Sequence, residues 1–305
     1  MDNTWRVEIR RGWIVGLALV VVLIAATVGL VVYAVVTPLS LVVFLAGLGA
    51  CVTLALVVRI LYQLWGLINA SYELDRNALM IHWGPVQHQV PMGSVREVLS
   101  GAKLKELKVR FSLRWPGYFV AIGRAETEAG ETADPLLFYA TRSLDQQVVL
   151  RTDGAAYAVS PADRDKFLVA LRERLEMGPT QEVEERSSHP AFLDWAIWRD
   201  GWALGMLLGS VALLVILVGV LAWQYPMLPQ QIGLRLTPDG EPLLLASRAR
   251  LFYLVAVAAA FLMINGGVGL FFYRRERPLS YFLWSGLLAT IGSLWAAVLS
   301  ILLLQ

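Results

Sequence analysis

Four long stretches of the chain lack Asp, Glu, Lys, Arg and His: residues 12–58, 201–234, 251–273 and 278–305. A helix needs about 20 apolar residues to cross the roughly 30 Å hydrocarbon core of a bilayer. The first stretch is long enough for two crossings, and Thr37-Pro38 divides it near its middle, where proline disfavours helix. The pattern therefore predicts five membrane-spanning helices. They cover residues 13–36, 39–60, 202–223, 251–272 and 279–303.

Between the second and third spans, continuous apolar runs give way to an alternation of apolar and polar residues, which is typical of half-buried strands. Ser160 and Pro161 then predict the start of a helix, with Ser160 as its N-terminal cap. Gly178-Pro179 predicts where that helix ends. The predicted strands cover residues 71–75, 78–83, 86–91, 107–113, 118–123, 136–141, 147–152 and 155–159.

Composition agrees with a membrane protein that contains one soluble insert. Of the 305 residues 57% are hydrophobic and 16% are charged, against about 25% charged in soluble domains. The fold class is therefore membrane α-helical with an inserted α+β domain, in a two-plus-three arrangement of spans. The predicted parts are a two-helix hairpin (1–69), the soluble domain (70–177), a linker with an interfacial helix (178–200) and three spanning helices (201–305) with a loop at 224–250.

Several short motifs in the soluble segment follow the order of one known small domain. They are Tyr72-Glu73-Leu74-Asp75, Val90-Pro91, Trp115-Pro116-Gly117-Tyr118 and Tyr157-Ala158-Val159-Ser160-Pro161. In these motifs the segment resembles the pleckstrin-homology domains of bacterial multi-pass membrane proteins of unknown function. The resemblance implies a β-barrel or sandwich closed by one C-terminal helix, and a role in binding lipid or protein. It implies no catalytic residue.

Two arginine clusters predict the orientation of the spans. One cluster precedes the first span and the other fills the turn between the last two: Arg6, Arg10 and Arg11, and Arg274, Arg275 and Arg277. Five spans place both clusters on the same side as the soluble domain, and such basic loops usually stay in the cytoplasm. We therefore predict a multi-pass protein of the bacterial inner membrane. Its N-terminus and soluble domain are cytoplasmic, and Gln305 lies outside with the loop at 224–250.

A cluster of basic residues is the strongest charge feature of the soluble segment: Lys103, Lys105, Lys108, Arg110 and Arg114. In a strand, positions 108, 110 and 114 would face one side. One interpretation is a solvated strand face. The other is a patch that contacts a protein partner or anionic lipid headgroups, to which each basic residue near the surface adds about 1 kcal/mol.

The spans carry few polar groups. Asn265, followed by Gly266, Gly267 and Gly269, predicts a helix-packing site. There the small residues allow close approach, and the asparagine amide forms a hydrogen bond to a neighbouring helix. The alternative is a substrate site. The chain contains no phosphate-binding loop, nucleophile elbow or metal-ligand spacing. We therefore predict no enzymatic activity, no cofactor and no metal.

Together these patterns predict a non-enzymatic integral membrane protein that presents a cytoplasmic interaction or regulatory domain. The predicted partners are the lipid bilayer, a protein or a second copy of the chain, and anionic headgroups, but not nucleic acid. Two alternatives stay open, a transporter or permease-like component and an accessory subunit of a membrane enzyme complex. The interaction hypothesis also predicts that residues 70–177 fold as an isolated soluble fragment.

Overall fold

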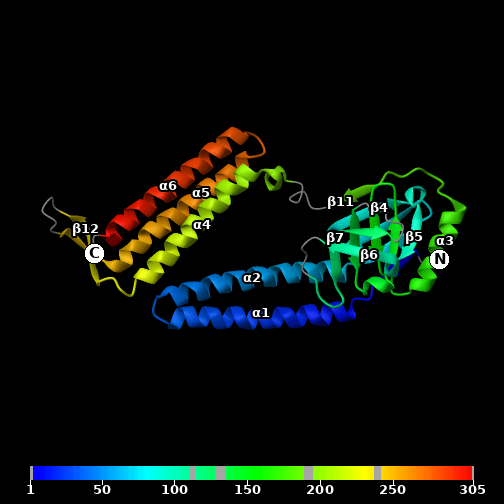
Figure 1. Ribbon diagram of the computed structural model, residues 1–305, viewed down its shortest axis with the longest axis horizontal. Helices are drawn as coiled ribbons and strands as arrows, with labels where there is room; N and C mark the ends of the chain where they lie inside the picture. The colour runs from blue at the N-terminus through cyan, green and yellow to red at the C-terminus, as the bar shows by residue number, and fades with distance from the viewer. Residues whose placement is uncertain (1–2, 110–113, 128–134, 189–194, 237–241, 304–305) are drawn as a thin grey trace. The chain divides into compact units, whose positions relative to one another are not determined.

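The computed structural model of the chain describes residues 3–109, 114–127, 135–188, 195–236 and 242–303. Within these ranges, five helices are long and apolar enough to cross a membrane, so the chain is a multi-pass membrane protein (Figure 1). The five helices are α1 (Arg10–Val36), α2 (Leu41–Ile68), α4 (Gly201–Gln224), α5 (Leu251–Phe272) and α6 (Arg277–Leu303).

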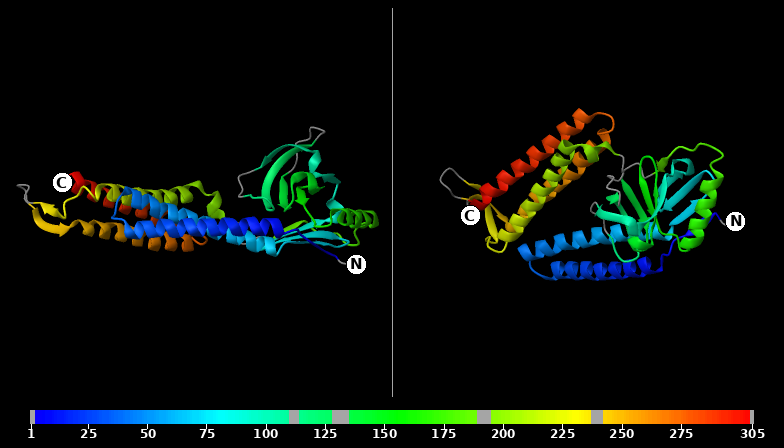
Figure 2. Two further views of the ribbon diagram at one scale, coloured as in Figure 1. Left: turned by 90° about the horizontal axis from the view of Figure 1, so that it is seen from below. Right: turned by 45° about the vertical axis from the view of Figure 1, so that its right-hand side comes forward.

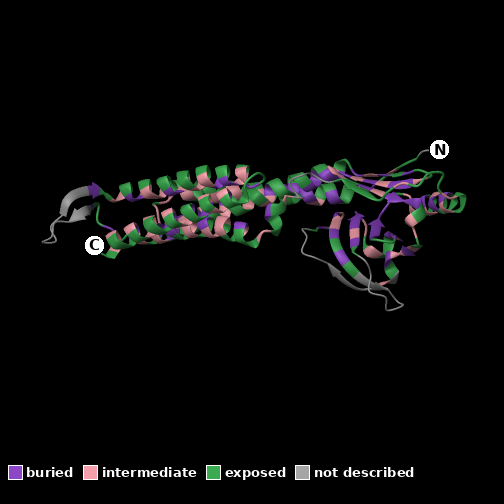
Figure 3. Cartoon of the chain, turned by 90° about the horizontal axis from the view of Figure 1, so that it is seen from above, coloured by how far each residue is buried: buried purple, intermediate pink, exposed green. Residues whose placement is uncertain are grey.

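α1 and α2 form an antiparallel pair, with α1 ending just before Thr37-Pro38 as predicted. A Cβ atom added to Gly16 would lie 2.6 Å from Leu64 Cδ2, and one added to Gly49 would lie 3.3 Å from Leu30 Cδ1. These glycines allow the two helices to pack closely. Many side chains of the long apolar helices are exposed or half-buried (Figure 3), as expected for helices that contact lipid.

Two separate sheets make up the β region (Figure 2). The first is antiparallel and has the order β1-β2-β3-β4-β11. Its strands are β1 (Thr4–Arg6), β2 (Ser71–Leu74), β3 (Ala78–Trp83), β4 (Val86–Pro91) and β11 (Arg186–Ser188). Because β1 precedes α1 and β2 follows α2, the helix pair is inserted between two neighbouring strands of one sheet.

The second sheet has the order β5-β9-β10-β8-β7-β6, and its β8 and β10 pair in parallel. Its strands are β5 (Glu97–Ser100), β6 (Leu104–Val109), β7 (Phe119–Thr127), β8 (Leu136–Ala140), β9 (Val148–Arg151) and β10 (Ala156–Val159). Among the described strands, no pairing joins the two sheets. Of the two predicted architectures, the structure has the sandwich.

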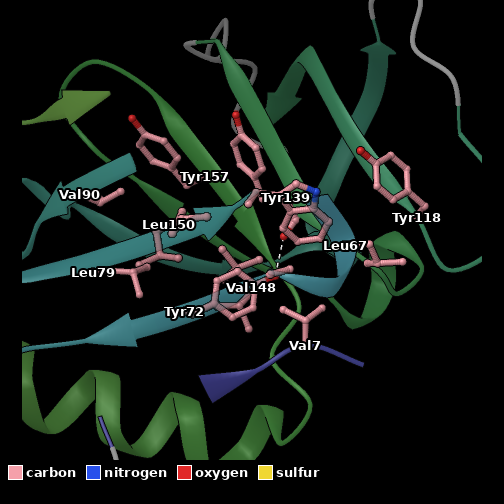
Figure 4. Close-up of a cluster of buried hydrophobic side chains, with 14 of the residues drawn as sticks. Val7, Leu67, Tyr72, Leu79, Val90, Tyr118, Tyr139, Val148, Leu150 and Tyr157 are labelled. Carbon is pink, nitrogen blue, oxygen red and sulfur yellow. Dashed lines mark hydrogen bonds between the residues drawn. The ribbon is translucent and has the colours of Figure 1, made fainter. Parts of the chain in front are cut away.

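The main core of the domain lies between the two sheets and continues into the end of α2. Tyr72 is fully buried there, and its hydroxyl donates a hydrogen bond to the carbonyl oxygen of Tyr139 at 2.5 Å. Val7 and Leu67 point toward the same cluster (Figure 4). Leu67 belongs to α2, which runs to Ile68, past residue 60 where we predicted the span to end. The helix pair therefore contributes directly to the hydrophobic core of the β domain.

α3 (Arg164–Met177) closes the domain and ends before Gly178, as predicted. The predicted cap at Ser160 is wrong. The helix is capped by Asp163, whose Oδ1 accepts a hydrogen bond from the Lys166 N–H at 3.2 Å. Ser160 is buried, and its Oγ accepts a hydrogen bond from the Thr141 N–H at 2.7 Å. A small polar residue before a proline is typical of a helix cap, but here the Ser160 hydroxyl bonds to the backbone just after β8.

Helices α4, α5 and α6 form a bundle in which Leu217, Leu287 and Ile291 are fully buried. A 3₁₀ turn, η4 (Ala196–Arg199), precedes α4 in the segment 178–200, where we predicted a linker and an interfacial helix. Residues 189–194 of that segment lie outside the described residues. The predicted loop at 224–250 contains a hairpin that we did not predict, formed by β12 (Gln231–Leu236) and β13 (Pro242–Ser247).

Candidate functional site

The turn Trp115-Pro116-Gly117-Tyr118 lies directly against the start of α1. The Trp115 and Tyr118 rings stack with their centroids 4.4 Å apart, and Trp115 Nε1 donates a hydrogen bond to the Gly12 carbonyl oxygen at 2.8 Å. A Cβ atom on Gly12 would lie 2.1 Å from the Gly117 oxygen, and Gly117 has a φ of +89°. The contact therefore requires glycine on both sides.

Beside this contact lies a cleft of about 630 Å³, lined by Glu8 and Arg11, by residues 115–119, and by residues 141–143 with Gln146. We call it the junction cleft. Three chain segments far apart in sequence form its walls: the segment entering α1, the turn before β7 and the segment after β8. Its volume falls within the range of about 300–1,000 Å³ that small-molecule sites usually have.

The charges of the junction cleft are partly paired. Arg142 donates from Nε and Nη2 to Glu8 Oε2 at 3.0 and 2.8 Å. The same Nη2 also donates to the Ala162 carbonyl oxygen at 3.0 Å, so this guanidinium is held in place. Arg11 and Arg142 against Glu8 leave one positive charge uncompensated among the lining residues. The cleft is therefore suited to a ligand with a single negative charge.

A chain of buried aromatic and polar groups leads from this cleft into the domain. Burial raises the pKa of Tyr118 to about 12. The Trp83 ring lies 6.1 Å from that of Tyr118 and 6.0 Å from that of Tyr139, centroid to centroid. The Tyr139 hydroxyl is 2.7 Å from Nε2 of buried His88. Tyr139 and His88 are joined here by a hydrogen bond, and Trp83 contacts the two tyrosines through its ring. In the described part of the chain no cluster of three His, Cys, Asp or Glu residues could hold a metal.

The structure places the predicted basic patch at the edge of the second sheet. Lys103 ends a 3₁₀ turn, and Lys105 and Lys108 lie on edge strand β6, whose register with β7 shifts between them. Arg110 lies outside the described residues. Arg114 is exposed, and its guanidinium lies 5.1 Å from the ring centroid of Phe119, which lines the junction cleft. The role of the patch stays a prediction, with one member next to the cleft.

Asn265 is half-buried on α5, and its predicted bonding role stays a prediction. The close approach of α5 and α6 occurs at Gly269, where a Cβ atom would lie 2.2 Å from Nε1 of buried Trp284. Ser280 Oγ also donates a hydrogen bond to the Gly269 carbonyl oxygen at 2.8 Å. A small residue thus mediates helix contact in this segment, one turn beyond the asparagine.

Asp200 accepts hydrogen bonds from residues in or next to each of the three helices of the bundle, at one end. We did not predict this role from the sequence. Its Oδ1 caps α4 by accepting a hydrogen bond from the Ala203 N–H at 3.1 Å. Its Oδ2 accepts from the hydroxyl of Tyr273, just after α5, at 2.6 Å and from the hydroxyl of Tyr281 in α6. The bond from Tyr273, then that from Tyr281, lowers the pKa of Asp200 to about 2.

Replacing Asp200 with Asn is expected to lower the stability of the bundle and to remove part of its dependence on pH. Because the folded pKa lies below the ordinary value of 3.8, the carboxylate stabilises the folded state above about pH 4. That contribution is lost as the pH falls further, toward the folded pKa. Asn retains the cap but not the charge. Thermal unfolding in detergent between about pH 7 and pH 2 measures the difference, and Asp145→Asn on the β domain is the control.

Five membrane-spanning helices, with a β-sandwich built onto the ends of the first two, define a class of multi-pass membrane proteins with an attached soluble domain. Residues 70–175 match the family model described as Bacterial PH domain, so the chain carries a bacterial PH domain. The match confirms the resemblance seen in the sequence motifs. The searches of curated proteins and of solved structures found no match. Strands β1 and β11 lie outside the matched residues, so the first sheet extends beyond the family domain.

Proposed function

We propose that the chain is a non-enzymatic protein of the bacterial inner membrane that holds its PH domain at the cytoplasmic surface as a docking site for a protein partner. The supporting observation is how the domain is attached. Only Asn69 and Ala70 separate α2 from β2, and Leu64 and Leu67 of α2 belong to the domain core. A domain attached in this way keeps a fixed orientation on the membrane, which suits docking.

Photo-cross-linking of the full-length protein in native membranes tests this proposal. A photoreactive amino acid at Val169, whose side chain is 57% exposed on α3, is expected to capture one or a few discrete proteins. The same group at Phe261, an exposed position of spanning helix α5, is the control and is expected to capture lipid. If scanning the exposed positions of the domain captures no protein, the docking proposal is wrong.

The proposed orientation predicts that the end of the chain lies outside the cytoplasm. An odd number of spans places residue 305 opposite the arginine clusters, which favour the cytoplasmic side. Alkaline phosphatase fused after Gln305 is therefore expected to be active, and green fluorescent protein fused there is expected to be dark. The reverse pattern would show that the layout of spans is wrong, whatever the domain binds.

A further inference from the structure

A second hollow of about 250 Å³ lies along the first turn of α1, lined by Glu8, Arg10, Arg11, Ile14 and Val15. We call it the N-terminal hollow. It shares Glu8 and Arg11 with the junction cleft. Ile14 is 54% exposed, and it faces the medium that surrounds a membrane-spanning helix. The two hollows therefore adjoin at Glu8 and Arg11, and the N-terminal hollow adds the apolar side chains of Ile14 and Val15.

Arg11 lines both hollows, and its guanidinium is not held in place as that of Arg142 is. Arg142 is held by Glu8 and by the Ala162 carbonyl oxygen. No carboxylate among the described residues forms an ion pair with Arg11. A guanidinium can donate two parallel hydrogen bonds to a phosphate group, so an unpaired arginine in a cleft favours a phosphate ligand.

The position along α1 distinguishes a lipid from a soluble phosphate compound. Arg10 and Arg11 begin the first spanning helix, and the apolar residues that follow must lie in hydrocarbon, so these arginines lie at the level of the headgroups. A phospholipid beside α1 has its phosphate at that level and its acyl chains along the apolar residues. A free phosphate compound would make no contact with Ile14 and Val15 in the N-terminal hollow.

We propose that the junction cleft and the N-terminal hollow together bind one anionic phospholipid. Its phosphate binds Arg11 in the cleft, and one acyl chain follows Ile14 and Val15. Arg11 supplies the uncompensated positive charge of the cleft, and Arg10, which lines the N-terminal hollow, adds a second positive charge beside the headgroup. The bound lipid would contact both α1 and the turn at residues 115–118, and so hold the domain against its own helix pair. This site lies apart from the predicted basic patch, except that Arg114 flanks it.

Native mass spectrometry of the delipidated full-length protein in detergent tests the proposal. The probes are dioleoyl phosphatidylglycerol, dioleoyl phosphatidylcholine with the same chains, and glycerol 3-phosphate. We expect one phosphatidylglycerol to bind at least about tenfold more tightly than the other two probes. Arg11→Gln is expected to lower that affinity about tenfold, which corresponds to about 1.4 kcal/mol. Arg172→Gln, at an exposed arginine of α3 that lines neither hollow, is expected to leave it unchanged.

A second variant fills the site without removing a charge. Ser143 is exposed and lines the junction cleft, so Ser143→Phe is expected to weaken phosphatidylglycerol binding while the domain stays folded. If both variants bind phosphatidylglycerol like the wild type, the site is wrong. If glycerol 3-phosphate binds as tightly as the lipid, the ligand is a soluble phosphate and the lipid assignment is wrong. No protein partner is present in this measurement, so its failure would leave the docking proposal untouched.

Discussion

Residues 70–177 expressed alone are expected not to fold cooperatively. The isolated fragment lacks β1 and β11, the two outer strands of the first sheet. It also lacks Leu64 and Leu67, whose side chains are 5% and 0% exposed in the domain core. Truncation of one buried leucine typically costs about 2–5 kcal/mol, and a whole domain is stable by only about 5–15 kcal/mol. The missing contacts are therefore comparable to the entire stability of the domain.

Thermal unfolding followed by near-ultraviolet circular dichroism measures this effect. The matched comparison joins residues 3–9 through a short Gly-Ser linker to residues 70–188, which restores β1 and β11 but not α2. This chain is expected to show a transition that the shorter fragment lacks. A sharp transition of the 70–177 fragment, at the temperature of the domain in the full-length protein, would contradict the prediction. It would also restore the expectation, drawn from the sequence alone, that the domain folds without its helices.

Gly117→Ala is expected to destabilise the domain by about 2–5 kcal/mol, as the sum of two effects. The added Cβ atom would lie 2.2 Å from the Gly12 nitrogen, and overpacking of this kind costs about 1–3 kcal/mol. The left-handed backbone with φ of +89° adds about 1–2 kcal/mol for any residue with a side chain. Separating the turn from α1 would also break the hydrogen bond from Trp115 to Gly12. Pulse proteolysis in urea, on protein in detergent, measures the loss.

Alanine substitutions at two other glycines help to separate the steric effect from the backbone effect. Gly178 has a φ of +67° but open space around the position of a Cβ atom, so Gly178→Ala is expected to show only the backbone effect. Gly29 on α1 also has open space and an ordinary helical backbone. Gly29→Ala is therefore expected to be neutral or slightly stabilising. If Gly117→Ala costs no more than the roughly 1–2 kcal/mol of a left-handed backbone alone, the turn does not press against α1.

The positions of the long apolar helices could be predicted from the sequence. The absence of charge over long runs located all five spanning helices because an ionised side chain is costly in hydrocarbon. Thr37-Pro38 located the turn within the first pair. Strands β2, β3 and β4 were predicted with nearly their observed bounds, since each alternates over several residues. β1 and β11 have only three residues each, and such short strands carry no readable period.

The candidate site could be predicted only in pieces. The motif at residues 115–118 was recognised as part of a resemblance, but its contact with Gly12 joins residues 103 positions apart. We used Arg11 only to predict the orientation of the spans. Its place in a cleft with Arg142 could not be predicted, because the two residues are far apart in the sequence. Asp200 was assigned to an interfacial helix, whereas its bonds to Tyr273 and Tyr281 depend on how three helices pack. Local patterns identify elements, and sites between elements require the tertiary structure.

The position of the helix pair between β1 and β2 also sets an order of events during biosynthesis. The ribosome completes β1 before α1, but its pairing partner emerges only after α2. The N-terminal strand therefore remains without its partner strand until both helices have been synthesised. The first sheet is completed later still, because β11 follows every strand of the second sheet in the chain.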